Sequence, residues 1–260
     1  MRLAMPIPST KEAQYIYDLW AWSWLAAMIT GVVTWGLMFY VFIKYRRRHE
    51  SEVPVQTRYN LPIEIFYTVA PVMMVIVFFF WTVETQDKVH HAPKDLVAAN
   101  AEADLNVTVV GQQWSWTFNY TKGNSAIESQ PVWEAGTTEK RPTLYLVEGQ
   151  SVSIDLYSPD VIHSFWVPNF LYKMDVVPGR EKYNHFTFTP NRAGTFDGRC
   201  AELCGVYHSR MLFNVEVTDQ ATFDAHMARL KAEGNTGVNL GGEMIQEVPG
   251  LGDHSNGGEE

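Results

Sequence analysis

A twelve-residue stretch in the last third of the sequence carries most of the side chains that could bind a metal ion. It reads CAELCGVYHSRM, from Cys200 to Met211, and it contains the only two cysteines among the 260 residues. Thiolate, thioether and imidazole groups are ligands for copper or zinc, whereas magnesium and manganese prefer carboxylate and water. The stretch therefore predicts a copper or zinc site.

The number of cysteines points beyond a single copper ion. A mononuclear blue-copper site takes one cysteine, two histidines and a weak methionine ligand, so Cys200 and Cys204 supply one thiolate too many. Two thiolates in one loop can instead bridge a pair of ions, each completed by a histidine and a weaker ligand. The loop contains His208 and Met211, and the best candidate for the second histidine is His163, in the apolar run VIHSFWVP. A disulfide or half of a zinc site stays open as an alternative on the cysteines alone.

Together, HSFWVP and CAELCGVYHSRM resemble the binuclear copper (CuA) centre of the cytochrome c oxidase subunit II family. In that family the second motif reads C-x-E-x-C-G-x-x-H-x-x-M, and every ligand position is filled in this sequence. The resemblance implies that Cys200 and Cys204 bridge two copper ions. It also implies that the remaining ligands of the motif complete the two ions, namely His163, His208 and Met211.

The same resemblance assigns two roles to Glu202 and implies the reaction. The backbone carbonyl of Glu202 would be a ligand of the second copper, and its side chain would bind magnesium or manganese at the interface with oxidase subunit I. Electrons would pass from cytochrome c, or from a c-type haem domain, through the copper pair to haem in subunit I. Dioxygen reduction and proton pumping would take place there, because this sequence has no C-x-x-C-H haem motif.

A tryptophan-rich run precedes the ligands. The segment GQQWSWTFNY, residues 111–120, has an aromatic residue at every second position from Trp114, and this pattern by itself favours a strand with one packed aromatic face. In the family, a tryptophan of this W-x-W element lies at the surface over the copper pair and admits electrons. The resemblance assigns that role to Trp114, with Trp116 as the alternative. Where relatives commonly have G-H-Q-W, this sequence has glutamine at position 112.

Two long apolar segments precede the β-rich part and predict a transmembrane helical hairpin. Residues 19–43 contain no charged residue, and a second helix is expected over about residues 63–83. About 20 apolar residues suffice to cross a bilayer, and Pro71 is tolerated in a membrane helix because neighbouring groups satisfy the freed carbonyl.

The distribution of basic residues predicts the orientation of this hairpin. The loop over residues 44–60 holds five lysine and arginine side chains, against two in the N-terminal segment 1–18. The positive-inside rule therefore places the loop in the cytoplasm. Both termini and the copper domain would then lie on the extracytoplasmic side of the cell membrane or inner membrane.

Glu64 stands where the second helix is expected to enter the membrane from the cytoplasm. On position alone, a first-turn carboxylate favoured by the helix dipole explains it. The resemblance adds an alternative, because in related oxidases a glutamate in this helix lies at the mouth of a proton-uptake path into subunit I.

From Leu105 onward the sequence consists of short runs rich in β-branched and aromatic residues, separated by turn-forming residues. In one run, Val152, Ile154 and Leu156 alternate with polar residues, including Asp155, as is typical of a strand with one buried face. We therefore expect an all-β Greek-key sandwich or barrel over residues 104–217, and the resemblance specifies a cupredoxin fold.

The flanking segments are expected to have simpler roles. Residues 84–103 are polar and rich in alanine and predict a linker, in which the adjacent histidines 90 and 91 are solvated rather than ligands. Residues 218–234 predict a helix with Thr218 as a possible N-cap, Gly234 as its end and one apolar face made by Phe223, Met227 and Leu230. Residues 235–260 predict an extended tail that could dock on a partner.

The net charge of -9 disfavours a nucleic-acid partner. Four carboxylates are expected near the copper face, where they would be simply solvated or, if clustered, would steer a basic cytochrome: Glu148, Asp155, Asp160 and Asp175. The sequence leaves these two interpretations open.

Three other classes share part of the pattern. A membrane-tethered copper chaperone needs neither Glu202 nor Met211, and a quinol oxidase subunit II lacks the copper ligands. Nitrous oxide reductase adds a large propeller domain. The hairpin together with the full ligand set favours an oxidase subunit that works with subunit I and other oxidase subunits.

Overall fold

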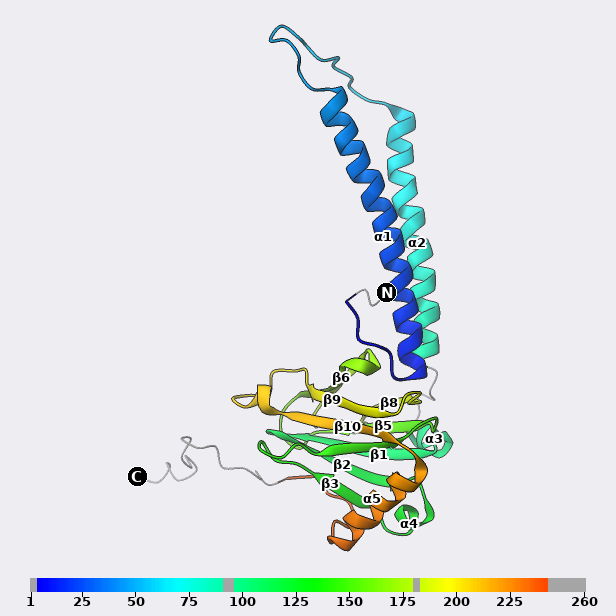
Figure 1. The fold of residues 1–260 in the computed structure, drawn as a ribbon, viewed down its shortest axis with the longest axis vertical. Helices are drawn as coiled ribbons and strands as arrows, with labels where there is room; N and C mark the ends of the chain where they lie inside the picture. Colours follow the sequence, from blue (N-terminus) through cyan, green and yellow to red (C-terminus); the bar gives the residue numbers. More distant parts are fainter. Residues whose placement is uncertain (1–3, 91–95, 180–182, 243–260) are drawn as a thin grey trace, which may run out of the picture. The chain divides into compact units, whose positions relative to one another are not determined.

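The computed structural model describes residues 4–90, 96–179 and 183–242. They divide into two compact units, a helical hairpin over residues 15–89 and a β-rich unit that contains residues 6–14 and the chain from residue 90 (Figure 1). Residues 243–260, which include most of the predicted tail, and His91 lie outside the described part.

The hairpin consists of α1 (Lys11–Lys44) and α2 (Leu61–Val89). Both helices are long and apolar enough to cross a membrane. No residue of α2 is buried, so its apolar side chains require lipid or a partner rather than a core of their own. Both helices extend beyond the predicted spans, since α1 begins at Lys11 and α2 continues to Val89. Residues 84–89 are therefore helical rather than part of a linker, and Glu84 and Lys88 form an ion pair of 3.2 Å in this last part.

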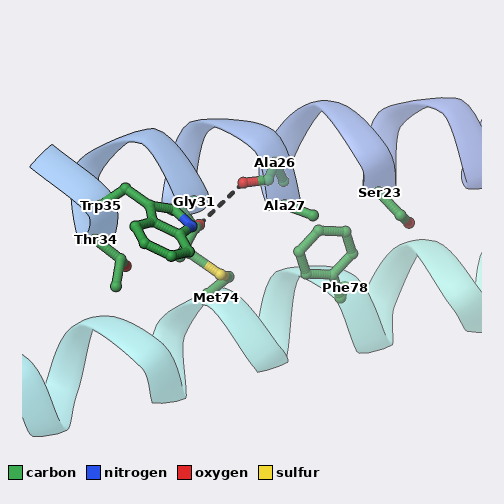
Figure 2. Close-up of a pocket in the computed structure, with 9 residues that line it drawn as sticks. Ser23, Ala26, Ala27, Gly31, Thr34, Trp35, Met74 and Phe78 are labelled. Atoms are coloured by element: carbon green, nitrogen blue, oxygen red, sulfur yellow. Dashed lines mark hydrogen bonds between the residues drawn. The ribbon is translucent and has the colours of Figure 1, made fainter.

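Small side chains on α1 face larger ones on α2 in the middle of the hairpin (Figure 2). Ala27 and Gly31 of α1 lie opposite Met74 and Phe78 of α2, and together with their neighbours they line an open apolar notch of about 500 Å³. The hydroxyl of Thr30 donates a hydrogen bond of 2.9 Å to the carbonyl of Ala26, so this polar side chain is satisfied within its own helix.

The β-rich unit is a sandwich of two five-stranded sheets, which confirms the predicted fold class. The first sheet has the order β3 (Val132–Ala135), β2 (Ser115–Lys122), β1 (Leu105–Gln112), β5 (Val152–Tyr157) and β8 (Asn184–Phe188). The second has the order β4 (Thr143–Val147), β10 (Leu212–Thr218), β9 (Gly194–Cys200), β6 (His163–Val167) and β7 (Tyr172–Val176). Two pairs, β1 with β5 and β10 with β4, are parallel.

An aromatic core fills the space between the sheets. Trp116, Phe165 and Phe213 are at most 1% exposed and contact one another, with ring centroids 4.9 to 5.9 Å apart. Gly198 on β9 makes room for this cluster, since a Cβ atom there would lie 2.1 Å from the Phe213 ring. The core therefore adjoins the ends of β6, β9 and β10, where the metal-binding candidates lie.

The short helix α3 (Leu96–Glu102) changes the environment of β5. Asn100 donates a hydrogen bond of 2.9 Å to Asp155, and Asp155 is only 8% exposed. The expectation of a solvent-facing side of this strand was wrong, because α3 covers Asp155. Residues 96–102, expected in a linker, are thus part of the folded unit.

Residues 6–10, which precede α1, together with the first turn of α1, belong to the β-rich unit. The Ser9 N–H donates to the carbonyl of Asn169, and the Lys11 N–H donates to the carbonyl of Thr189, both at 3.0 Å. In return, the buried carboxylate of Glu12 accepts a hydrogen bond of 2.9 Å from the Thr189 N–H. Residues 6–14 are therefore held against the sandwich by reciprocal hydrogen bonds.

After the sandwich comes α5 (Gln220–Ala232), with the predicted apolar face buried. Its N-cap is Asp219 rather than Thr218, because the Asp219 side chain accepts a hydrogen bond from the Thr222 N–H. The helix ends before Gly234, which has a φ of 85° and is a residue type suited to this left-handed conformation. The remaining short helices are α4 (Ser125–Ser129) and the 3-10 turns η1 (Pro168–Phe170) and η2 (His208–Arg210).

Candidate metal centre

Strand pairing brings the predicted ligands together at one end of the sandwich. His163 begins β6 and Cys200 ends β9, and the register pairs Phe165 with Cys200. Met211 directly precedes β10, which pairs with the other edge of β9. A sequence gap of 37 residues between His163 and Cys200 is therefore closed by two neighbouring antiparallel strands.

The sulfur and nitrogen atoms form a compact donor cluster. The Sγ atoms of Cys200 and Cys204 are 3.8 Å apart. Nδ1 of His163 lies 3.9 Å from the first sulfur, and Nδ1 of His208 lies 3.7 Å from the second. The Met211 sulfur is 3.7 Å from Cys204 Sγ. The two thiols thus occupy the centre of the cluster, with one imidazole beside each.

These distances exclude a disulfide in this structure. A disulfide needs a sulfur separation of about 2.0 Å, and both cysteines are free. The backbone carbonyl oxygen of Glu202 lies 3.2 Å from Sγ of Cys200, whereas the Glu202 side chain is exposed. The donor set therefore consists of two thiols, two imidazoles, one thioether and one carbonyl. That composition suits a pair of soft metal ions better than a single zinc.

The two cysteines differ in their affinity for protons. The hydrogen bond from Cys204, helped by His163, lowers the pKa of Cys200 to about 3. The same interaction with Cys200, together with burial, raises the pKa of Cys204. The pair gives up its first proton easily and holds the second, which is the behaviour of two coupled groups.

Asp160 fixes the orientation of His163. The buried imidazole donates from Nε2 to the Asp160 carboxylate at 3.0 Å, which leaves Nδ1 directed at Cys200. Burial opposes protonation of His163, but the hydrogen bonds to Asp160 and Cys200 outweigh it and raise the histidine's pKa. Asp160 also accepts a hydrogen bond of 2.7 Å from the Gln113 N–H. One carboxylate therefore connects the histidine loop to the turn between β1 and β2.

The turn between β1 and β2 also supports the cysteine loop. The carbonyl of Cys204 accepts hydrogen bonds from Gln113 Nε2 at 2.7 Å and from Trp114 Nε1 at 3.1 Å. Gly205 permits this approach, since a Cβ atom there would lie 3.0 Å from the Trp114 indole nitrogen. The side chains of Gln113 and Trp114 thus hold the backbone of the loop at Cys204.

The predicted aromatic strand is interrupted at Trp114. Trp114 lies in the turn rather than on β2, and it is only 6% exposed because the Tyr207 ring packs against it at 5.3 Å. The expectation of a tryptophan on the open surface is not met. Trp116 is fully buried and donates from Nε1 to the Met211 carbonyl at 3.3 Å. Both tryptophans therefore contact the ligand loop, Trp114 from the outer side and Trp116 from the core.

The four carboxylates predicted near the copper face do not form one group. Asp155 is buried under α3, and Asp160 binds His163. Glu148 follows β4, whose end pairs with the end of β10 far from Met211. Asp175 is exposed on β7 beside Ser164 of β6. Steering by these four residues as a cluster is therefore excluded by their positions.

Two other candidates make contacts of their own. His90 packs against Tyr172 with ring centroids 5.6 Å apart and does not join the cluster. Glu64 lies in the first turn of α2, where its Oε1 atom accepts a hydrogen bond of 2.9 Å from the Asn60 N–H. This geometry supports the helix-capping interpretation of Glu64.

Several functional residues were not identified from the sequence, namely Gln113, Gly205, Tyr207 and the positioning role of Asp160. Their contacts span long sequence gaps, as with the 91 residues between Gln113 and Cys204. Only Asp160 offered a local signal, since it stands three residues before His163.

Comparison with known proteins agrees with the sequence motifs. The family described as "Cytochrome C oxidase subunit II, periplasmic domain" matches residues 105–218. The "Probable cytochrome c oxidase subunit 2" of Streptomyces coelicolor is 45% identical over an alignment that covers 91% of this chain and 81% of that protein. The "Cytochrome c oxidase subunit 2" of Corynebacterium glutamicum is 31% identical, covering 88% and 76% respectively.

Comparison with solved structures finds a partial match. The periplasmic domain of subunit II of cytochrome oxidase of Bradyrhizobium japonicum is 27% identical, with a TM-score of 0.44. The match covers 51% of this chain and 96% of that one.

Proposed function

This chain belongs to the cytochrome c oxidase subunit II family, and from that premise we propose that its donor cluster holds a pair of copper ions reduced by a c-type haem protein. The chain is the subunit through which electrons enter a haem-copper terminal oxidase. Its β-rich unit is cupredoxin-like, and the two apolar helices make it a membrane protein.

The observation that carries the proposal is the symmetry of the cluster. Two free thiols stand 3.8 Å apart with an imidazole nitrogen beside each. Cys200 and Cys204 would bridge the two ions, and His163 and His208 would complete one ion each. Met211 and the Glu202 carbonyl supply the weaker ligands. When bound, such a copper pair accepts and donates single electrons.

The chain's own residues prepare the site for this task. His163 and Met211 are 0% exposed, and Cys200 and Cys204 are 5% and 4% exposed, so water is kept from these four donors, while His208 is half-buried. Asp160 keeps the proton on Nε2 of His163, so Nδ1 stays available as a ligand. Ligands held by strand ends and hydrogen bonds need little rearrangement on a redox change.

The surface around the donors supports the proposal that partner proteins bind there. Leu203 and Val206 are 78% and 67% exposed in the cysteine loop, and Val161 and Ile162 are exposed beside His163. Exposed apolar groups of this kind mark protein contacts. We propose that this surface contacts oxidase subunit I and the haem donor, and that the exposed Glu202 side chain shares a magnesium or manganese ion with subunit I.

The proposed topology is a two-span hairpin with the loop 44–60 in the cytoplasm. Residues 6–14 are hydrogen-bonded to the sandwich, which supports placing the start of α1 and the metal domain on one side of the membrane. A cysteine introduced at Ser51, in a chain whose Cys200 and Cys204 are replaced by serine, tests it with a membrane-impermeant maleimide. Labelling only after cell lysis supports the cytoplasmic loop, and labelling of intact spheroplasts contradicts it.

For Glu64 we propose a proton-uptake role in addition to the observed cap. Glu64→Gln keeps an acceptor for the Asn60 N–H but removes the titratable group. Slower turnover of the oxidase, with an unchanged helical circular dichroism signal, supports proton uptake. Unchanged turnover leaves capping as the only role.

The test of the copper proposal is copper quantitation with electron paramagnetic resonance on the purified full chain. We expect two coppers per chain and one unpaired electron shared equally by both nuclei. Cys204→Ser should abolish the shared-electron spectrum, whereas Ser209→Ala, at an exposed residue of the same loop, should retain it. One copper per chain, or a single-nucleus spectrum, contradicts the proposal of a copper pair.

A further inference from the structure

Several buried oxygen atoms of the β-rich unit have no hydrogen-bond partner. Among the described residues, six buried side-chain oxygens are of this kind, and four of the six belong to neighbouring residues: Asn100 Oδ1, Asn106 Oδ1, Ser153 Oγ and Asp155 Oδ1. Buried polar atoms are nearly always hydrogen-bonded, so each exception requires an explanation. A group of four in one place indicates a ligand that satisfies all of them.

Three of these side chains share the outer face of the first sheet. The strands β1 and β5 run parallel, and their register pairs Asn106 with Ser153. The next residues, Val107 and Ile154, belong to the hydrophobic core, so the side chains of Asn106, Ser153 and Asp155 point to the opposite face. These three residues are 8%, 0% and 8% exposed, so the outer face is closed to solvent here.

The helix α3, which lies against β5, supplies the fourth oxygen (Figure 1). Asn100 of α3 donates from Nδ2 to Oδ2 of Asp155 at 2.9 Å. Its backbone carbonyl accepts a hydrogen bond of 2.9 Å from Nδ2 of Asn106. One residue of α3 therefore contacts both strands. Its contacts use both amide nitrogens and one carboxylate oxygen, and they leave the four oxygens above without a donor.

Two basic side chains border this group, one on each neighbouring strand. Lys122 stands opposite Asn106 on β2, but its ammonium group donates to the α3 carbonyl of Ala101 at 2.9 Å. His185 stands opposite Asp155 on β8. Burial raises the pKa of Asp155, although the hydrogen bond from α3 and the charge of His185 oppose this shift. The protein itself therefore compensates the buried carboxylate only in part.

We infer that the four oxygen atoms are ligands of a hard cation and that calcium is the ion that fits them best. Calcium takes about six to eight oxygen ligands, including carboxylate and amide oxygens, in a flexible geometry. Magnesium demands a nearly ideal octahedron, and copper and zinc favour nitrogen and sulfur. Four protein oxygens leave positions for water. A single carboxylate makes the site weak, with a Kd of about 10⁻⁴ to 10⁻³ M.

Such an ion fastens α3 to the first sheet, because its ligands come from α3, β1 and β5. None of the four residues belongs to the donor cluster of the proposed copper pair. The inference therefore goes beyond the proposed function and does not depend on it.

Equilibrium dialysis of the purified, copper-loaded full chain against radioactive calcium at about pH 7 tests the site. Asp155→Asn should bind one calcium ion fewer per chain than the unmodified protein. Ser153→Ala removes one ligand without changing the charge, and it should weaken calcium binding at this site by about tenfold. The matched control is Asp175→Asn, which removes the same charge from an exposed position on β7. It should bind as much calcium as the unmodified chain.

Thermal unfolding separates a cation site from a purely structural role. In calcium-free buffer, Asp155→Asn should melt at a higher temperature than the unmodified chain, because the variant removes a buried charge with an unpartnered oxygen. Calcium at about 10 mM should raise the melting temperature of the unmodified chain by a few degrees and that of Asp155→Asn hardly at all. Magnesium at the same concentration should have little effect on either.

Equal calcium binding by Asp155→Asn and the unmodified chain would overturn the cation site. A rise in melting temperature that calcium gives equally to both proteins would overturn it as well, and buried water would then pair with the four oxygens. Copper is quantified in the same samples, so a failure of the proposed copper pair is seen separately.

Discussion

Nε2 of the buried His163 and the carboxylate of Asp160 are 3.0 Å apart, and this hydrogen bond determines which ring nitrogen faces the cysteines. Asp160 itself accepts hydrogen bonds from the Gln113 and Val161 N–H groups at 2.7 and 2.6 Å. The orientation of one candidate ligand thus depends on a carboxylate that is held by two other backbone groups.

Asp160→Ala should therefore weaken copper binding by about 10- to 100-fold, as expected for loss of a residue that orients a metal-bound histidine. The copper affinity of Asp160→Asn should lie between those of Asp160→Ala and the unmodified chain, because asparagine keeps a hydrogen-bond acceptor without the charge. Competition titration with a copper chelator measures the affinity. Asp175→Asn, on the exposed face of β7, serves as the control. Equal affinity in Asp160→Ala and the unmodified chain would contradict the positioning role.

Substitutions of the two tryptophans should separate an effect on electron transfer from an effect on the stability of the fold. Trp114→Phe removes the indole that contacts Tyr207 and the Cys204 carbonyl, so reduction by cytochrome c should slow while two coppers are retained. Trp116→Phe removes a fully buried core side chain and should mainly lower the melting temperature. Stopped-flow reduction and thermal unfolding, measured on both variants, check the distinction. A Trp114→Phe variant with an unchanged reduction rate would rule out this residue as the point of electron arrival.

The stability of the folded chain should depend on pH through the titration of Asp155. Burial raises its pKa above the ordinary 3.8, although the hydrogen bond from Asn100 partly opposes this shift. A raised folded-state pKa means that stability is lost as the pH rises through that value. One of its oxygens, Oδ1, is also buried without a hydrogen-bond partner among the described residues. Asp155→Asn should therefore stabilise the chain at pH 7 by about 1 kcal/mol, and by less at pH 4.

Asp104 serves as the control, because the pH dependence of its contribution to stability has the opposite sign. Hydrogen bonds from the backbone and side chain of Ser151 lower the pKa of Asp104. Its contribution is present above pH 3.8 and is lost as the pH falls through the lowered value. Asp104→Asn should then lower the melting temperature at pH 7, with a smaller effect near pH 3. Thermal unfolding at several pH values tests both variants, and shifts of the same sign would refute the assignment.

Gly198→Ala should destabilise the sandwich by about 1 to 3 kcal/mol, the usual cost of an overpacked core. The added methyl group would overlap the Phe213 ring, which packs against Trp116. Since Gly198 stands two residues before Cys200, copper affinity should fall as well. Chemical unfolding gives the free energy, with Asp197→Ala as the control, because the Asp197 side chain is 74% exposed. An unchanged unfolding free energy would show that the ring moves away without cost.

The sequence by itself determined the local properties of this protein. Two apolar runs long enough to cross a bilayer, the alternation that gives β-strands, and the spacing of thiols, imidazole and thioether in residues 200–211 are all encoded by near neighbours. These patterns sufficed to predict the hairpin, the sandwich and the donor set, because each depends on backbone periodicity or on ligand chemistry.

Only the tertiary structure decided which distant groups support those donors. Strand register brings Asp160 to Gln113, and Trp114 to the carbonyl of Cys204, across 47 and 90 residues. The covering of Asp155 by α3 and the hydrogen bonds between the Asn119 side chain and the backbone of Asn239 are decided in the same way. Contacts of this kind depend on how whole sheets and loops pack. No local periodicity in the sequence predicts that packing.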